Sequence, residues 1–299
     1  MSSLRILVAG SSGFLGSHLK AELVGRGHAV VSLVRRPTSA PDESAWDPYA
    51  GTCDRAQIEQ ADVVVNLAGS PTFGNPHSKK WARRLRDSRV TTTRVLAEAI
   101  ASSDRKPAFL AGNGVSYYGD HGNDVLTEES DSRGGAMLTE VTRDWQAAAE
   151  PAADAGARLC VLRTAPVMDR RSMPLKQLRL LFKAGLGARL GKGDQHMAMV
   201  SLRDWVGAIA HLAEHESATG AFNVCCPRTP TNAEFTKALA EALDRRAFLV
   251  APRPLLRVGA GPMAPELLGS LNVRPAALEA QGYQFRDREV HAVLSTALR

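Results

Sequence analysis

Three glycines near the start of the chain have the types and spacing of a phosphate-binding turn. Gly10, Gly13 and Gly16 are each separated by two residues. The residues before them, 4–8, are almost all aliphatic, which predicts a parallel strand covered on both faces. The residues after them, 17–26, carry leucines four positions apart and predict a helix. The glycines therefore connect a strand to a helix, which is where dinucleotides are bound.

Each glycine has its own role in such a unit. The first permits the tight turn, the second lets backbone approach a pyrophosphate, and the third lets the helix pack closely on the strand. The phosphates then meet unpaired backbone N–H groups at the helix N-terminus. The residues expected to hold the cofactor here are Gly10, Ser11, Ser12, Gly13, Phe14, Leu15 and Gly16.

The end of the second predicted strand indicates which dinucleotide is bound. Residues 29–34 are mostly apolar, and Val34 is followed by Arg35 and Arg36 with no acidic residue. A carboxylate at this position binds the adenosine ribose of NAD, whereas a basic residue accommodates the 2′-phosphate of NADP. Guanidinium groups form charge-assisted, bidentate bonds to phosphate. We therefore expect NADP, with NADPH favoured over NADH; the alternative is two surface arginines before Pro37.

Two later strand ends are expected to complete the cofactor site. Residues 62–69 are nearly all apolar and end in small residues, as does a central strand beneath a cofactor. The channel residues predicted from this strand are Leu67, Ala68 and Gly69. Residues 158–164 predict a further strand, and Arg163 near its end is expected at the nicotinamide side.

Strand and helix patterns alternate through about residue 225, and a mostly helical tail follows. This order predicts an α/β fold, a doubly wound parallel-sheet Rossmann domain over 1–225 with a small, mostly helical C-terminal domain over 226–299. A long helix is expected at 79–101, after the central strand.

Composition narrows the classes of partner. The chain has 299 residues and a formal charge of +6. Its densest basic cluster, 79–86, is interpreted as the solvated face of a helix, so no nucleic-acid partner is expected. The four cysteines show neither metal-ligand spacing nor a disulfide framework, and no metal is expected. With no signal peptide and no run long enough to span a bilayer, we expect a cytoplasmic protein with no membrane partner.

Taken together, these motifs resemble those of the atypical short-chain dehydrogenase/reductase (SDR) proteins, which are described as "epimerase family protein" or nucleoside-diphosphate-sugar epimerase-like. The resemblance covers nearly the whole length. Beyond the glycine turn it rests on the motifs at 46–48, 65–69, 87–90, 117–120, 126–128, 162–164, 185–187, 231–235 and 282–285.

The resemblance implies an NADP-binding Rossmann fold followed by a C-terminal domain of unknown function. Its implied cofactor contacts are Arg35, Leu67, Ala68, Arg89 and a residue near Val167. Many SDR proteins pair through the long helices beside the active site, so a homodimer is expected by analogy.

The chemistry that the resemblance implies is incomplete in this chain. Extended SDR enzymes use a tyrosine as acid and base, and a lysine four residues later lowers its pKa. Here Leu138 stands at the tyrosine position and Thr142 at the lysine position. Asn113 replaces the serine that stabilises the substrate oxygen.

Other residues of the same loop are candidates for the missing roles. Tyr118 or Tyr117 would serve as an acid if Arg89 or Arg163 favoured the ionised phenol. Asn113 would donate a hydrogen bond to a substrate carbonyl. The alternative is structural: Tyr117 packs in the core, Tyr118 caps a turn and Asn113 bonds loop backbone.

Two functions remain open at this stage. The first is an NADP-dependent oxidoreductase or epimerase-like enzyme acting on a small carbonyl or sugar-nucleotide-like substrate. The second is an NADP(H)-binding sensor or scaffold with little or no turnover. The glycine turn supports both functions, and the missing Tyr-x-x-x-Lys motif favours the second.

Overall fold

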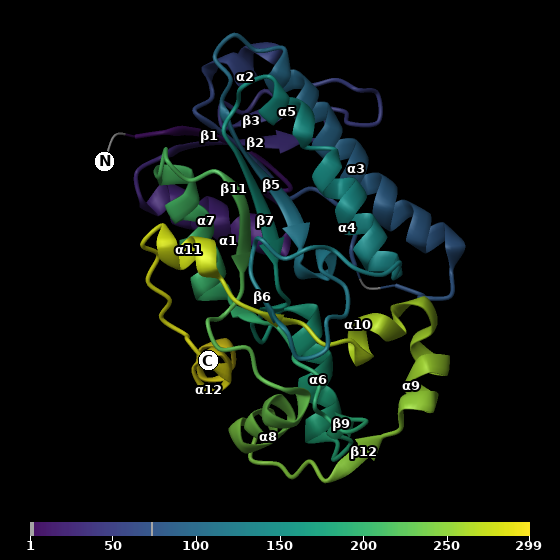
Figure 1. The fold of residues 1–299 in the computed structure, drawn as a ribbon. Coiled ribbons are helices and arrows are strands. Elements are labelled where there is room, and N and C mark those ends of the chain that lie inside the picture. Colours follow the sequence, from purple (N-terminus) through teal and green to yellow (C-terminus); the bar gives the residue numbers. More distant parts are fainter. Residues whose placement is uncertain (1–2, 73) are drawn as a thin grey trace.

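A seven-stranded parallel sheet forms the centre of the computed structural model, which describes residues 3–72 and 74–299 (Figure 1). The strand order is β11-β7-β5-β4-β1-β2-β3. The strands are β1 (Arg5–Ala9), β2 (Ala29–Val34), β3 (Glu43–Ala45), β4 (Val63–Asn66), β5 (Ala108–Gly114), β7 (Leu159–Thr164) and β11 (Gly220–Val224). The chain runs from β1 out to β3 and then crosses back to β4, so the order reverses between β1 and β4. The predicted doubly wound fold is confirmed, and ligands bind at such a switch point, outside the carboxyl ends of the strands.

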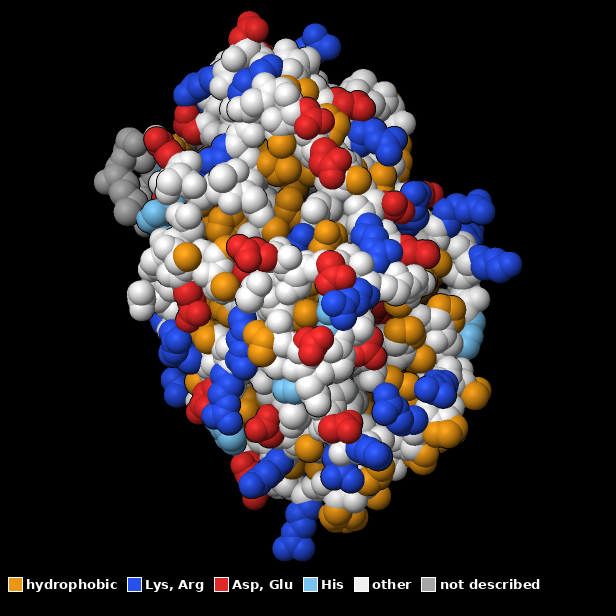
Figure 2. All heavy atoms as spheres, viewed as in Figure 1, with side chains coloured by type: hydrophobic (Ala, Val, Ile, Leu, Met, Phe, Trp, Pro, Cys, Tyr) orange, Lys and Arg blue, Asp and Glu red, His pale blue; other side chains and the backbone are white. Residues whose placement is uncertain are grey.

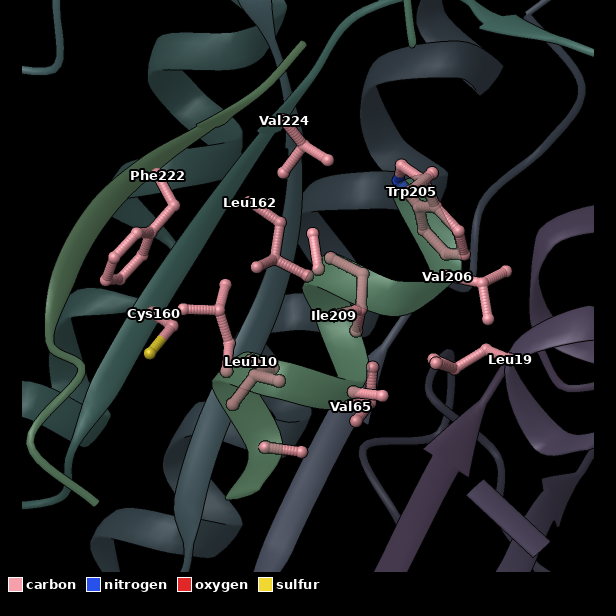
Figure 3. Packing of buried hydrophobic residues seen from close by; sticks show 14 of the residues in the cluster. Leu19, Val65, Leu110, Cys160, Leu162, Trp205, Val206, Ile209, Phe222 and Val224 are labelled. Atoms are coloured by element: carbon pink, nitrogen blue, oxygen red, sulfur yellow. The ribbon is translucent and has the colours of Figure 1, made fainter. Parts of the chain in front are cut away.

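Helices cover both faces of the sheet. On one face lie α1 (Phe14–Gly25), α7 (Leu202–Glu214) and α11 (Ala276–Ala280); on the other lie α2 (Arg55–Gln60), α3 (Lys79–Ala101), α4 (Met137–Ala147) and α5 (Glu150–Asp154). Alternate residues of β1 serve the two apolar clusters, Ile6 and Val8 on one side and Leu7 and Ala9 on the other. Figure 3 shows α7 packing Trp205 and Ile209 over the first face. Burial on both faces explains why the strands read as continuous apolar runs.

The local patterns located most of these elements. The helix predicted at 79–101 is observed as Lys79–Ala101, and the side chain of Ser78 caps it by accepting a bond from the Trp81 N–H. The strand predicted at 62–69 ends at Asn66, because the chain turns there into the cofactor side of the sheet. The three-residue edge strand β3 was not predicted.

A smaller lobe lies beyond the carboxyl ends of the strands, in the lower half of Figure 1. Its elements are η1 (Val115–Tyr117), β6 (Val125–Leu126), β8 (Val167–Met168), α6 (Met173–Lys183), β9 (Ala188–Leu190), β10 (Val200–Ser201), α8 (Asn232–Ala242), β12 (Leu249–Ala251), α9 (Arg253–Ala260), η2 (Gly261–Met263), α10 (Ala264–Leu268), β13 (Asn272–Val273) and α12 (Val290–Ala297). Its apolar cluster joins Leu175 and Phe182 of α6 to Phe235 of α8 and Leu294 of α12. Residues before 226 thus share a core with residues after it, and the boundary at 225 and 226 stays a prediction.

None of the helices in 3–72 and 74–299 is both long and apolar enough to cross a bilayer.

Leu110 of β5 tests the sheet core. Its side chain is fully buried in the apolar cluster that joins the sheet to α1 and α7, so Leu110→Ala is expected to lower the free energy of unfolding by about 2–5 kcal/mol through lost burial and a residual cavity. Urea unfolding measures the loss. Val24→Ala, on the exposed side of α1, should change the same quantity by less than about 0.5 kcal/mol. Equal effects would mean that β5 is not at the centre of the core.

Candidate cofactor site

The turn between β1 and α1 is built from backbone alone. Gly10 has a φ of +81°, and a Cβ there would lie 2.7 Å from the carbonyl carbon of Leu67. A Cβ on Gly16 would collide with the Gly10 oxygen and lie 2.8 Å from the Gly10 carbonyl carbon. Gly13 is less confined, since a Cβ there would lie 3.2 Å from the Gly10 oxygen. The first and third glycines are therefore required by space, and the first also by its φ.

The N-terminus of α1 has no side chain of its own to cap it. Gly13 is the N-cap residue, and the first turn, which begins at Phe14, holds no acidic residue. The first N–H groups of a helix have no intrahelical acceptor, and they attract an anion by position and by the helix dipole. The guanidinium of Arg171 lies 5.9 Å from the ring of Phe14 and is paired with Asp169, so a basic residue that sequence reasoning missed stands beside this turn.

The end of β4 is fixed by a buried amide. The Asn66 side chain accepts a bond from the Ala68 N–H at 3.0 Å and donates one to Thr93 Oγ1 at 2.8 Å. Leu67 and Ala68 are half-buried and Gly69 is exposed, so the predicted channel residues follow the strand at the switch point. A rigid backbone at this place can border a planar ligand.

Arg89 lies against the segment that follows β4. Its guanidinium donates bonds to the Ser70 and Leu85 carbonyls, both at 3.1 Å, and to Thr72 Oγ1 at 3.0 Å. A Cβ on Gly69 would lie 3.3 Å from Arg89 Cγ. Burial lowers the pKa of Arg89 to about 10, which leaves the side chain protonated at neutral pH. The structure therefore brings a positive charge to the residues predicted from β4.

The two arginines after β2 differ in their partners. Arg36 donates to Glu43 Oε1 at 2.8 Å. Arg35 is exposed and forms no ion pair with any residue in the described part of the chain. Val34 before it is half-buried. Arg35 thus keeps its guanidinium available for a ligand at the end of β2.

Tyr118 is fully buried in a polar network. Its hydroxyl donates to Asn223 Oδ1 at 2.7 Å and accepts from Arg163 Nη1 at 2.9 Å. Burial raises the pKa of Tyr118 to about 12, although the positive charge of Arg163 acts in the opposite direction. The ring of Tyr117 is half-buried and lies 3.7 Å from the Arg163 guanidinium carbon. Both phenols are thus arranged around one buried arginine.

Arg163 itself is occupied by protein acceptors. Besides Tyr118, it donates to Gln146 Oε1 at 3.0 Å and to the Glu128 carbonyl at 3.2 Å, and it is only 3% exposed. Val167 is buried in the apolar cluster against which Phe14 packs. Neither residue presents an open polar surface.

Asn113 and Thr142 bond each other across β5 and α4. Asn113 Nδ2 donates to the Thr142 carbonyl at 3.1 Å, and its Oδ1 accepts from the Gly114 N–H at 2.7 Å. The hydroxyl of Thr142 donates to the Leu138 carbonyl at 2.8 Å. Both groups of the Asn113 amide are therefore bonded within the protein.

One polar pair at the end of β5 was not predicted. Ser116 Oγ donates to Glu266 Oε2 at 2.7 Å, which joins η1 to α10 of the C-terminal segment. Burial raises the pKa of Glu266. The two residues are 150 positions apart, and no local pattern marks either of them.

Comparisons with known proteins match nearly the whole chain. Residues 6–225 match the NAD dependent epimerase/dehydratase family, and residues 251–297 match a domain of unknown function, DUF1731. An "epimerase family protein" of Mycobacterium leprae is 38% identical over 98% of this chain and 95% of its own length.

Two solved structures are also similar. The crystal structure of human epimerase family protein SDR39U1 with NADPH has a TM-score of 0.87 and 30% identity, covering 98% of this chain and 99% of that one. The nucleoside-diphosphate sugar epimerase from Corynebacterium glutamicum has a TM-score of 0.79 and 32% identity, covering 99% of this chain and 58% of that one. The glycine turn, the seven-stranded parallel sheet and these matches together show that the chain belongs to the NAD dependent epimerase/dehydratase family, as an atypical SDR.

Proposed function

We propose that this protein binds NADP(H) at the β1–α1 turn. The observation that carries the proposal is the exposed Arg35 at the end of β2, which forms no ion pair with the residues that the structure describes. It lies at the same sheet edge as a glycine turn that leaves room only for backbone. The free guanidinium would bind the 2′-phosphate, and the uncapped N-terminus of α1 would bind the pyrophosphate. The NADPH bound by the human relative supports this choice of cofactor.

The other residues predicted to contact the cofactor fall into two groups, those that border the nucleotide directly and those that are buried behind it. We propose that Val34, Arg36, Leu67, Ala68, Gly69 and Arg89 border the nucleotide, together with the seven residues of the turn. Arg163 and Val167 are buried and would act from behind this surface, Arg163 by holding Tyr117 and Tyr118.

The geometry favours a binding protein with little turnover over an efficient oxidoreductase. A general acid must reach the substrate, and its pKa must lie near the working pH. Tyr118 meets neither condition, because its hydroxyl is bonded to Asn223 and Arg163 and its pKa is about 12. Asn113 is likewise bonded within the protein. We therefore propose an NADP(H)-binding sensor or scaffold as the principal function.

An oxidoreductase acting on a small carbonyl or sugar-nucleotide-like substrate is the second candidate. It is favoured by one pair, Ser116 and Glu266, which supplies a hydroxyl and a carboxyl of raised pKa at the carboxyl end of β5. Such a carboxyl can hold a proton at a pH where an ordinary glutamate has lost it. We also propose a homodimer, by analogy with other SDR proteins. A cytoplasmic location and a domain boundary after residue 225 stay proposals that rest on the sequence pattern.

Arg35→Ala tests the cofactor. Wild type is expected to bind NADPH more tightly than NADH, and the variant should bind NADPH roughly 10- to 100-fold more weakly, as expected for the loss of charged hydrogen bonds. Its affinity for NADH should change by less than about threefold, because NADH has no 2′-phosphate. Fluorescence titration with both nucleotides measures these affinities.

Arg36→Ala is the matched control, since it removes the same charge from a residue already paired with Glu43. It should weaken NADPH binding much less than Arg35→Ala. If neither nucleotide binds to wild type, the glycine turn has lost its function and the proposal is wrong.

Tyr118 tests the catalytic alternative. We expect its phenol to stay protonated up to about pH 11, so the absorbance difference between wild type and Tyr118→Phe at 295 nm should develop only near pH 12. Because the pKa is raised on folding, the phenol's contribution to stability is present below pH ~10 and is lost as the pH rises through about 12.

The same variant should still bind NADPH, within about twofold of wild type, and should unfold more easily by about 1–3 kcal/mol because Arg163 and Asn223 lose a buried partner. Ionisation of Tyr118 below pH 9, or loss of turnover without loss of stability, would favour a catalytic role instead.

A further inference from the structure

The small lobe exposes an unusual amount of apolar side chain. Thirteen large hydrophobic residues are exposed in the described part of the chain, and ten of them lie in two segments, 173–186 and 248–267. They are Met173, Leu180, Leu181, Leu186, Phe248, Leu249, Val250, Leu255, Val258 and Leu267. Single exposed apolar residues are ordinary, whereas a concentration of this kind marks an interaction surface.

The two segments are joined in space. Strand β9 pairs with β12 in parallel, with Ala188 opposite Leu249 and Leu190 opposite Ala251. The side chain of Arg253 then packs against Gly191. Figure 2 shows hydrophobic and basic side chains gathered over the lower right of the molecule, where Figure 1 places β12 and α9.

The same segments carry a one-sided charge. The ranges 170–193 and 245–265, which hold most of these segments, contain eleven of the 37 lysines and arginines and none of the 31 acidic residues, although Asp169, Asp194, Asp244 and Glu266 lie directly beside them. The rest of the chain, with 26 basic and 31 acidic residues, therefore has a net charge of −5. Among the eleven, within the part of the chain that the structure describes, only Arg171 forms an ion pair, with Asp169. These two ranges of the small lobe therefore carry an excess of basic side chains, most of which form no ion pair within the described residues.

Helix α9 is the most exposed part of this surface. It has eight residues and none of them is buried; Leu255 is 68% and Val258 is 76% exposed. Arg257, one turn from Arg253 on the same helix, is exposed without an ion pair in the described residues. Phe248, just before β12, is 78% exposed. Apolar and basic side chains therefore alternate over one short stretch.

We propose that this lobe, through α9, β12 and α6, docks on the surface of an anionic lipid bilayer. Leucine, valine and phenylalanine side chains would enter the boundary between headgroups and acyl chains, while arginine and lysine would bind the anionic headgroups. A second copy of the chain would bring two unneutralised basic faces together, which costs free energy. Nucleic acid would match the charge but would not bury aliphatic side chains, since its bases stack on aromatic ones.

This association needs no membrane-spanning segment. No membrane partner was predicted from the sequence, because no apolar run is long enough to cross a bilayer, and the described residues contain no helix that could do so. A helix lying in the interface needs only one apolar face and flanking basic residues. Whether apolar side chains can reach a membrane surface depends on their exposure, and that exposure is set by the fold of the small lobe and not by the length of an apolar run.

Sedimentation of the full-length protein with vesicles tests the proposal. Wild type should sediment with vesicles of phosphatidylcholine mixed with phosphatidylglycerol but not with vesicles of phosphatidylcholine alone. Raising the salt from about 0.1 M to about 1 M should release much of the bound protein, because screening shortens the range of the electrostatic attraction.

Two combined variants separate the charged from the apolar contribution. The combined variant Arg245→Gln, Arg246→Gln and Arg257→Gln should bind the anionic vesicles more weakly by roughly fivefold for each charge removed. The combined variant Phe248→Ser, Leu255→Ser and Val258→Ser should also lose binding at unchanged charge.

The matched control is Arg55→Gln, Arg94→Gln and Arg105→Gln, which removes three exposed charges from α2, α3 and the segment before β5 and should leave vesicle binding within about twofold. The first residues of α3 are not used, because His77 beside them contacts Gly259 of α9. Circular dichroism melting checks that each variant folds. No sedimentation with the anionic vesicles would overturn the proposal. So would a dimer in solution that the apolar variant dissociates, or binding to DNA or RNA that exceeds vesicle binding and is unchanged in the apolar variant.

Discussion

The site depends on a contact between backbone atoms at the switch point of the sheet. Helix α1 comes so close to the β1–α1 turn that a Cβ on Gly16 would collide with Gly10, and Gly10 in turn lies against the backbone between Leu67 and Ala68. Three segments from β1, α1 and β4 thus meet with no side chain between them. A phosphate placed here can accept hydrogen bonds from the N–H groups of the first turn of α1. The geometry of the backbone, and not the identity of any side chain, therefore determines the phosphate-binding part of the proposed cofactor site.

A second constraint is the buried amide of Asn66. Its oxygen fixes the Ala68 N–H and its nitrogen bonds Thr93, which also accepts a bond from the Trp145 indole at 2.8 Å. The network therefore ties β4 to α3 and α4, and the Arg89 guanidinium lies 5.2 Å from the Trp145 ring. These buried polar groups are bonded to one another, which holds the backbone after β4 in place.

Sequence reasoning recovered what local patterns determine. The glycine turn, the helix Lys79–Ala101 and the strand Ala29–Val34 follow from residue spacing and burial on two faces, and the structure agrees. The short pairings of the small lobe could not be found in this way, because two- and three-residue strands such as β9 and β12 exist only through partners about 60 residues away. Arg163 was expected at the nicotinamide side because it lies near the end of the strand predicted at 158–164, and the structure shows it to be buried. The partners that allow its burial, Tyr118, Gln146 and the Glu128 carbonyl, come from distant parts of the chain.

Cofactor binding and acid–base chemistry depend on different parts of this fold. This chain keeps the features expected for binding and lacks the side chains that SDR enzymes use for the chemistry. The nucleotide is expected to be held mainly by backbone and by one free arginine, whereas acid–base chemistry in SDR enzymes depends on side chains of the helix that is α4 here. In α4 the hydroxyl of Thr142 bonds the carbonyl of Leu138, and the carbonyl of Thr142 accepts a bond from Asn113. Leu138 and Thr142 stand where those enzymes have a tyrosine and a lysine, and the polar groups named here at both positions are hydrogen-bonded within the protein. Ser116 and Glu266 form a hydroxyl–carboxyl pair where the C-terminal segment meets the sheet. Chemistry that used this pair would depend on the docking of the small lobe, whereas nucleotide binding at β1 would not.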